Sequence, residues 1–477
     1  MATGSAWMVA MRWSIRGIGL LATITLVRLL TPADFGMVAM AMLVVGLIEV
    51  FSSTGQQFAL IRHPDPNREH FDTAWTISVL IGLALGGIVL LVAPLAQYYF
   101  REPAIVDVIR VLSIRVFIMG FENIGTVMFR RNLDFAAEFR FNVYKKLVPF
   151  VITLTLALIW RNYWALVVGI VVGQVAGVVL SYIVHPFRPR FRLTRTRDLW
   201  SFSIWVLINH IGAYGQGSVD QLVIGGVVPP QIMGQYTIGA ELASLPTTEI
   251  VDPIGRALFP VMSGLNHDSA RLRLLLLDVL GLIAVLSTAA ATGLALVADD
   301  LVIVMLGDNW REMAPLIPGL AFTGALVGFA NVASLVFNAV GDPRRGAMQS
   351  WLCTALLLPT MIIAVRFTDL EGVVMARLIV WLIILPVSFH YLLQLLPITR
   401  ADVAAVIWRP IVAAAMMAWV LSVLPFDAVT IPALRLGLRV ITGAAVYGAV
   451  LMAAWQVAGR PGGVERLVIA AVSGRQL

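Results

Sequence analysis

The sequence predicts an all-α polytopic membrane protein with about fourteen transmembrane helices. The first observation is its composition, since 59% of the 477 residues are apolar and only 13% are charged. Soluble domains average about 45–50% apolar and about 25% charged residues. The second observation is that the apolar residues form long blocks, many near the ~20 residues that cross a ~30 Å hydrocarbon core. The third is that these blocks lack strand-like alternation, so helices satisfy the backbone.

Turn residues separate the apolar blocks and set their approximate limits. Examples are His63-Pro64-Asp65-Pro66, Pro229-Pro230 and Gly341-Asp342-Pro343. The connections are short, which leaves no extramembrane domain for catalytic machinery, so we expect a protein that is not an enzyme. The expected spans are 8–30, 35–55, 72–99, 104–129, 135–160, 163–186, 199–224, 231–256, 274–298, 314–340, 348–366, 371–396, 403–424 and 434–458.

Arginine is distributed unevenly over the connections between these spans. With a cytoplasmic N-terminus, the opposite side holds only Arg101, Arg161 and Arg311, with Arg28, Arg366 and Arg435 at its borders. The positive-inside rule therefore predicts a multi-pass protein of the inner (plasma) membrane with both termini in the cytoplasm. The arginines of the cytoplasmic connections and tail are Arg62, Arg68, Arg130, Arg131, Arg188, Arg190, Arg192, Arg195, Arg197, Arg271, Arg273, Arg344, Arg345, Arg400, Arg460, Arg466 and Arg475.

The sequence carries no motif for metal, disulfide or nucleic-acid chemistry. Its single cysteine, Cys353, lies in an apolar block, so no disulfide framework can form. The histidines are scattered and do not form the paired spacing of a zinc site. The net charge of +7 is spread over short connections rather than gathered in one patch. We therefore expect no cofactor, no metal and no nucleic-acid partner.

An internal repeat is visible at the starts of corresponding helices. Pro32-Ala-Asp-Phe-Gly36 opens the second span, and Pro230-Gln-Ile-Met-Gly234 opens the eighth, about 198 residues later. Further on, Gly120-Phe121-Glu122-Asn123 resembles Gly328-Phe329-Ala330-Asn331. Each half has six spans, so the repeat is parallel, and its two lobes should enclose a central site. The predicted divisions are an N-terminal lobe at 1–197, a C-terminal lobe at 198–398, two additional transmembrane helices at 399–458 and a cytoplasmic tail at 459–477.

Motifs along most of the chain resemble the Wzx-type polysaccharide transporter family of the multidrug/oligosaccharidyl-lipid/polysaccharide exporter superfamily. They extend from about residue 10 to residue 400. The match is specific because all the motifs occur together, whereas any single motif would be weak. Glu241 departs from the family, which often has a basic residue there. The motifs are Val27-Arg28-Leu29-Leu30-Thr31-Pro32-Ala33-Asp34-Phe35-Gly36, Ala59-Leu60-Ile61-Arg62, Thr73-Ala74-Trp75, Trp164-Ala165-Leu166-Val167, Asp220-Gln221-Leu222-Val223-Ile224-Gly225, Leu258-Phe259-Pro260 and Leu306-Gly307-Asp308-Asn309-Trp310.

The resemblance implies two helical lobes around a central cavity and a specific cargo. That cargo is an undecaprenyl-pyrophosphate-linked oligosaccharide repeat unit, a precursor of exopolysaccharide, capsule or O-antigen, which moves from the cytoplasmic to the periplasmic leaflet. Expected partners are this substrate, membrane lipids, a polysaccharide polymerase and a chain-length regulator. Two alternatives stay open: a cation-coupled multidrug antiporter of the same superfamily and a membrane-embedded polysaccharide polymerase.

Basic residues inside the spans are the first candidate site residues, because a charge at the bilayer centre costs at least ~2.5–3.5 kcal/mol unless it is paired or wet. Guanidinium groups suit the bidentate binding of pyrophosphate. For Arg12 and Arg16, snorkelling to lipid headgroups is an equal alternative. Arg110 is expected to snorkel, and Arg115 to face the cavity or form an interhelical pair. The predicted substrate-binding residues are Arg12, Arg16, Arg115, Lys145, Lys146 and Arg256.

Acidic residues inside the spans are the second set, as candidates for coupling transport to protons or cations. Glu49 lies deep in the second span. Glu122 lies two turns beyond Arg115, on the same face of the expected fourth span. Asp220 follows a glycine-rich stretch, and Glu241 is deep in the eighth span. The predicted coupling residues are Glu49, Glu122, Asp220 and Glu241.

Overall fold

The protein is helical throughout the described part of the chain. The computed structural model describes residues 2–52, 60–61, 65–196, 203–265 and 267–460, and within these ranges it contains no strand. Among these described residues, eleven helices are long and apolar enough to cross a membrane. The all-α membrane fold predicted from the sequence is therefore confirmed, and the predicted tail beyond residue 460 lies outside the described residues.

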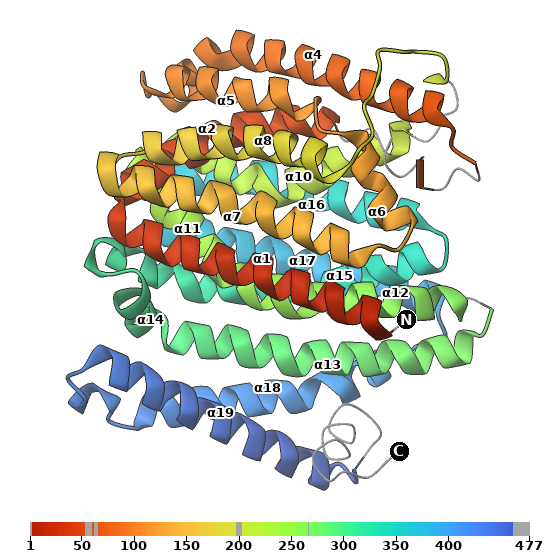
Figure 1. The fold of residues 1–477 in the computed structure, drawn as a ribbon. Coiled ribbons are helices and arrows are strands. Elements are labelled where there is room, and N and C mark those ends of the chain that lie inside the picture. The colour runs from red at the N-terminus through yellow and green to blue at the C-terminus, as the bar shows by residue number, and fades with distance from the viewer. Residues whose placement is uncertain (1, 53–59, 62–64, 197–202, 266, 461–477) are drawn as a thin grey trace. The chain divides into compact units, whose positions relative to one another are not determined.

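Two compact units make up the chain, at 1–234 and 235–477. The predicted lobe boundary at 197/198 follows the internal repeat and stays a prediction. In the N-terminal unit, α1 (Ala2–Leu29) packs against α7 (Phe135–Trp160), which pairs with α8 (Trp164–Val184) (Figure 1). α4 (Arg68–Phe100) runs along α5 (Ile105–Met119). α2 (Pro32–Glu49) contacts α4, α5 and α10 (Ser203–Gly225).

The start of α2 is fixed by a capping box. Thr31 is the N-cap, and its hydroxyl accepts from the Asp34 backbone N–H, while the Asp34 carboxylate accepts from the Thr31 N–H. Pro32 occupies the first turn, where its missing N–H costs nothing. Asp34 also accepts from the Tyr163 backbone N–H at 2.8 Å, which ties α2 to the turn between α7 and α8. The Thr-Pro-x-Asp part of the family motif is therefore structural.

Two expected spans are broken, which corrects the predicted ranges 104–129 and 231–256. α5 ends at Met119, and the chain continues through a short turn, η2 (Ile124–Thr126), into α6 (Val127–Arg131). The backbone of Gly120 lies close to that of Ser78 on α4, an approach that only glycine allows. The eighth span consists of α11 (Pro230–Pro246), a π-helical turn η3 (Thr247–Val251) and α12 (Asp252–Gly264). Two prolines flank this turn, and proline interrupts helical hydrogen bonding.

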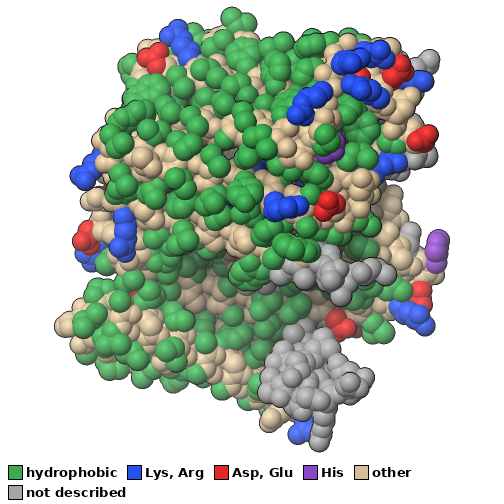
Figure 2. Space-filling view, viewed as in Figure 1, with side chains coloured by type: hydrophobic (Ala, Val, Ile, Leu, Met, Phe, Trp, Pro, Cys, Tyr) green, Lys and Arg blue, Asp and Glu red, His purple; other side chains and the backbone are tan. Residues whose placement is uncertain are grey.

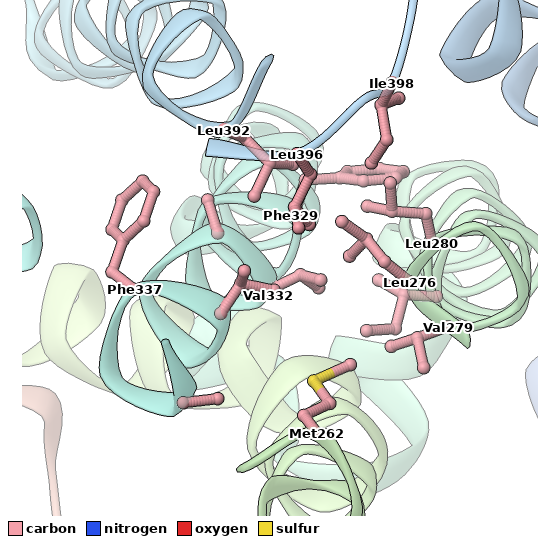
Figure 3. Close-up of a cluster of buried hydrophobic side chains, with 14 of the residues drawn as sticks. Met262, Leu276, Val279, Leu280, Phe329, Val332, Phe337, Leu392, Leu396 and Ile398 are labelled. Atoms are coloured by element: carbon pink, nitrogen blue, oxygen red, sulfur yellow. The ribbon is translucent and has the colours of Figure 1, made fainter. Parts of the chain in front are cut away.

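The C-terminal unit is arranged around α15 (Ile317–Ala339), which contacts α12, α13 (Ser269–Leu296), α16 (Pro343–Phe367) and α17 (Leu370–Leu395). Figure 3 shows the apolar cluster at one end of this bundle, with side chains from α12, α13, α15 and the end of α17 converging. Its labelled members are Met262, Leu276, Val279, Leu280, Phe329, Val332, Phe337, Leu392, Leu396 and Ile398.

The last two helices, α18 (Arg400–Val423) and α19 (Pro432–Val457), pair with each other, and α18 packs against α13. α14 (Ala298–Met305) contacts α19 through the fully buried Asp300. Its carboxylate accepts from Arg435 at 2.7 Å and from Arg439 at 3.0 Å, and Arg439 also pairs with Asp427 at 3.1 Å. This ionic cluster anchors α19 to the bundle of the C-terminal unit.

Charged side chains gather where the helices end. Figure 2 shows apolar side chains over the middle of the helices of the N-terminal unit and a group of basic side chains over the segment that follows α8. This segment is extended over 185–193 and runs beside the start of α4. The Arg190 N–H donates to the buried Asp72, and the Arg192 N–H donates to Thr76. Side chains of α4 thus satisfy backbone groups that have no partner in a helix.

Candidate functional site in the N-terminal unit

An ion pair joins α2 to α5 within the spans of the N-terminal unit. Arg115 Nη2 lies 3.2 Å from Glu49 Oε2, and the two side chains are 22% and 16% exposed. A second guanidinium nitrogen of Arg115 lies 3.9 Å from the Met42 sulfur. Because an unpaired charge is costly inside a bilayer, the carboxylate of Glu49 stabilises the guanidinium at this depth.

A second ion pair joins α7 to the turn after α5. Lys145 Nζ lies 2.7 Å from both carboxylate oxygens of Glu122. The side chains are 32% and 28% exposed, so the pair is held but remains reachable. The ring of Phe141, one turn earlier on α7, lies 5.5 Å from the Lys145 ammonium. The pair is thus partly exposed on both sides and has the Phe141 ring beside its ammonium group.

A small cavity of about 180 Å³ borders the second pair. It lies at the break after α5, since Met119, Gly120 and residues of the following turn line it. Its walls combine the Glu122 carboxylate with hydroxyl and amide groups, and Met119, Gly120 and two isoleucines complete the lining. The polar lining residues are Ser52, Ser78, Glu122, Asn123 and Thr126.

Arg115 and Glu122 do not form the same-face pair that their spacing suggested. The reason is that α5 ends at Met119, so Glu122 lies in the following turn and not on the helix. Each group instead pairs with a residue of another segment, Glu49 for Arg115 and Lys145 for Glu122. The Arg115–Glu49 pair is interhelical, whereas Lys145 of α7 pairs with Glu122 from a turn, and each pair unites a predicted substrate-binding residue with a predicted coupling residue.

Lys145 and Lys146 diverge, as the 100° step of a helix requires. Lys145 turns to Glu122, whereas Lys146 is exposed, with its stem near Gly19 of α1. Arg110 is exposed and pairs with Asp107 at 3.2 Å on its own helix, in keeping with a position at the helix end. The two lysines therefore have different environments despite being neighbours in sequence.

The remaining candidates lie apart from these pairs. Arg12 and Arg16 are partly buried on α1, and each has interactions with neighbouring groups. Asp220 is 1% exposed within α10. Glu241 is exposed on α11, and the side chain of Arg256 lies outside the described residues. The structure thus brings together four of the predicted residues, Arg115, Glu49, Lys145 and Glu122, in two pairs.

Asn123 is a site residue that the spacing analysis did not single out. It is fully buried, and its amide donates to the carbonyls of Ser181, His185 and Phe187 at 3.4, 3.3 and 2.8 Å. Its carbonyl caps the η2 turn by accepting from Gly125 N–H. The available signal was its place in the repeated Gly-Phe-x-Asn sequence.

His185, at the end of α8, links this network to the extended segment. Its Nδ1 accepts from the Phe187 backbone N–H at 3.2 Å. Burial, and then the positive charge of Arg188, lower the pKa of His185, so the neutral acceptor form is favoured. The His185 ring thus holds the start of the extended segment through the Phe187 backbone N–H.

A wider hollow of about 750 Å³ lies at the opposite end of α4. Aromatic, proline and glycine residues line most of it, including Pro94, Tyr98, Tyr99 and Gly226, and Arg101 is the one charged lining residue in the described part of the chain. It lacks the paired charges found near Glu122. The two ion pairs of the N-terminal unit therefore differ from this hollow in offering paired charges.

Comparison with protein-family models matches residues 25–315 to a family described as "Polysaccharide biosynthesis protein". Among curated relatives, the lipopolysaccharide biosynthesis protein WzxC of Escherichia coli is 21% identical, covering 82% of this chain and 80% of that protein. The succinoglycan biosynthesis transport protein ExoT of Rhizobium meliloti is 23% identical, covering 79% of this chain and 76% of that protein.

Solved structures of membrane transporters share the fold. The lipid II flippase MurJ in an inward closed conformation matches with a TM-score of 0.77 at 11% identity, covering 94% of this chain and 99% of that chain. An inward-facing multidrug resistance MATE family transporter of the MOP superfamily matches with a TM-score of 0.60 at 14% identity, covering 79% of this chain and 94% of that chain. The chain therefore has the helical fold of this group of transporters.

Proposed function

Because the chain belongs to the polysaccharide biosynthesis protein family, we propose that it is a flippase for a lipid-linked oligosaccharide. Its cargo is an undecaprenyl-pyrophosphate-linked repeat unit, which it carries from the cytoplasmic to the periplasmic leaflet of the inner membrane. The names of WzxC and ExoT place those relatives in polysaccharide biosynthesis and its transport. The observation that carries the proposal for this chain is the Lys145–Glu122 pair beside a polar cavity.

Each carboxylate holds a cation in the substrate-free protein. Glu49 pairs with Arg115, and Glu122 pairs with Lys145, so neither basic group is isolated within the spans. The pyrophosphate of the cargo offers more negative charge and more acceptor oxygens than one carboxylate. It therefore displaces Glu122 from Lys145 and Glu49 from Arg115, while the lipid tail remains in the bilayer.

Release of the two carboxylates supplies a means of coupling transport to protons. A carboxylate that loses its cationic partner is left as an isolated negative charge in a poorly solvated place, and binding a proton removes that charge. Deprotonation on the other side would restore the ion pair and expel the pyrophosphate. Arg12 and Arg16 on α1, with the exposed Lys146, serve as the basic approach to these pairs.

Transport requires only binding and movement, so no catalytic group is assigned. The two lobes at 1–197 and 198–398 alternate in access to the two sides, with both termini in the cytoplasm. Helices α18 and α19 lie outside the repeat. The polysaccharide polymerase and chain-length regulator expected from the family resemblance act on the product that this protein delivers.

The test is translocation of the lipid-linked repeat unit by the full chain in proteoliposomes. A double variant, Lys145→Met with Glu122→Gln, removes both charges at once and avoids leaving one of them unpaired in the membrane. We expect its transport rate to fall by at least about tenfold. Its free energy of unfolding should stay within about 1 kcal/mol of that of the parent.

A matched control removes a pair of the same kind from an exposed place. Arg110→Met with Asp107→Asn deletes the exposed pair of α5. It should transport at the parental rate, since exposed pairs contribute only about 0–1 kcal/mol and this one lies away from the cavity. Parental transport by the Lys145/Glu122 double variant would refute the proposed role of this pair. If the unmodified protein exports cationic drugs and does not move the lipid-linked sugar, the antiporter function is supported instead.

A further inference from the structure

The C-terminal unit contains a cavity of about 330 Å³ that the pyrophosphate mechanism does not use. α15 forms one wall, α12 forms the second, and α13 contributes the apolar side chains Val279 and Ile283. Its volume is at the lower end of the ~300–1,000 Å³ usual for small-ligand pockets. No Lys, Arg, Asp or Glu lines it among the described residues.

Three polar side chains face this cavity from α15. Asn331, Ser334 and Asn338 are spaced so that they lie along one face of the helix. Ser334 lies 3.5 Å from the Gln349 side chain of α16. For the amides of Asn331 and Asn338, the structure shows no hydrogen bond to any group in the described ranges. Asn338 is exposed at the end of α15, whereas Asn331 is partly buried within the helix, where an unsatisfied amide is costly, so Asn331 calls for a polar occupant.

The opposite wall is shaped by the π-helical turn. Val251 is the last residue of η3, and Gly255 follows about one turn later; both border the cavity. π-helical turns occur often at functional sites. Thr247 holds the turn in place by donating to the Gly324 carbonyl at 2.8 Å. The nearest atom to a Cβ built at Gly255 would be a Leu335 methyl at 3.8 Å, so this wall leaves room for an occupant.

The internal repeat gives this cavity a counterpart in the N-terminal unit. Asn331 corresponds to Asn123, and each borders a cavity between the corresponding helices of its half. The side-chain amide of Asn123 donates hydrogen bonds to three backbone carbonyls, whereas that of Asn331 makes no such bonds among the described residues. Glu122 corresponds to Ala330, so the charged group of the first cavity is absent from the second. The two halves therefore offer a charged site and a neutral polar site.

We propose that the cavity of the C-terminal unit binds one sugar ring of the cargo. An amide both donates and accepts hydrogen bonds, which suits the hydroxyl groups of a sugar. Val279 and Ile283 suit the C–H faces of the ring, and the lack of a lining charge disfavours pyrophosphate and metal cations. This inference rests on the proposed flippase function and assigns recognition of the sugar to a place separate from the ion pairs.

The test compares two lipids with the full chain in nanodiscs. One is undecaprenyl pyrophosphate, which has no sugar, and the other is the lipid-linked repeat unit extracted from the source strain. Asn331→Leu with Asn338→Leu should weaken binding of the glycosylated lipid by about tenfold and leave the affinity for undecaprenyl pyrophosphate unchanged. Asn132→Leu, at an exposed amide after α6, is the matched control and should bind both lipids as the parent does.

A second variant approaches the cavity from the other wall. Gly255→Val fills it without altering an amide and should give the same selective loss, so the test does not depend on the folding of one variant. Equal loss of affinity for both lipids, or parental affinity of both variants for the glycosylated lipid, would overturn the sugar site. Failure of the parent to bind or move either lipid would instead overturn the flippase function.

Discussion

Asp34 shows how much of a family motif can be structural. Its carboxylate accepts from the Thr31 N–H, the Thr31 hydroxyl and the Tyr163 N–H at 2.9, 2.6 and 2.8 Å. The Asp34 side chain is 9% exposed, and these three donors satisfy the hydrogen-bonding capacity of its buried carboxylate at the start of α2. A buried acid in a recurring motif suggests chemistry, yet here every contact serves to position the chain.

At the residue scale, the sequence predicts which charges are deep but not which charges meet. The length of the spans places Arg115, Lys145 and Glu49 within the bilayer, and the cost of an isolated charge predicts that each has a partner. Glu49 and Arg115 lie on helices separated by another span, so no local spacing rule connects them. Pairing across helices depends on how the helices pack, whereas helical periodicity in a single sequence predicts only which residues share a face of one helix.

His185 makes the segment after α8 sensitive to pH. Its pKa is lowered by burial and by Arg188, so the folded protein favours the neutral ring, whereas the unfolded chain protonates near pH ~6.5. Between these two pKa values the unfolded state binds more protons, so the stabilisation is complete at higher pH and is lost as the pH falls below ~6.5. We expect the Phe187 amide, which donates to His185, to lose hydrogen-exchange protection at pH 5.5 relative to pH 7.5.

The measurement corrects each amide for its intrinsic exchange rate at the two pH values. His185→Gln cannot be protonated in this range, so it should remove the pH dependence of protection at Phe187. His267→Gln, at an exposed histidine of the C-terminal unit, should leave that dependence as in the parent. Protection that is independent of pH in the parent would contradict the role of His185.

At the element scale, the starts of α2 and α11 touch through two glycines that the repeat makes equivalent. A Cβ on Gly36 would fall on the Pro230 carbonyl, and a Cβ on Gly234 would fall on the Pro32 carbonyl. The contact is reciprocal, as expected for two related segments that cross at their glycines. The repeated Pro-x-x-x-Gly of the sequence thus has a steric basis.

Alanine at either glycine should therefore separate the two helix starts. We expect Gly36→Ala and Gly234→Ala each to destabilise the detergent-purified protein by about 1–3 kcal/mol, because the added methyl meets backbone atoms and overpacks the contact. Differential scanning fluorimetry measures the shift in melting temperature. Gly437→Ala, in α19 with open space around it, should be neutral or stabilising by up to about 1 kcal/mol. Equal melting temperatures for all three variants would show that the contact is not tight.

Uninterrupted spans are predicted well from the sequence, and broken ones are not. Long apolar helices such as α13 and α17 coincide with apolar blocks because lipid requires both length and apolarity. The breaks after Met119 and Pro246 occur inside the predicted spans 104–129 and 231–256. Hydropathy is averaged over a window of residues, so it cannot reveal a close backbone approach or a π-helical turn. Both cavities that carry our proposals adjoin these breaks, so the sequence alone misses the shape of the sites.

At the scale of the whole molecule, the distribution of arginine predicts how the chain lies in the membrane. Thr194 belongs to the basic segment after α8, and the positive-inside rule assigns this segment to the cytoplasm. Glu371, in the first turn of α17, belongs to the poorly basic set of connections and is assigned to the periplasm. Both side chains are exposed, so each position can report its side.

Cysteine labelling of the full chain tests this orientation. Cys353, the one native cysteine, is fully buried, so the parent should react little with a membrane-impermeant maleimide. In intact spheroplasts Glu371→Cys should be labelled, because its thiol faces the outer solution, whereas Thr194→Cys should be labelled only after the membrane is disrupted. The opposite result would place the basic segment outside. The pyrophosphate carrier would then have to load from the periplasmic leaflet, and the proposed direction of transport would be wrong.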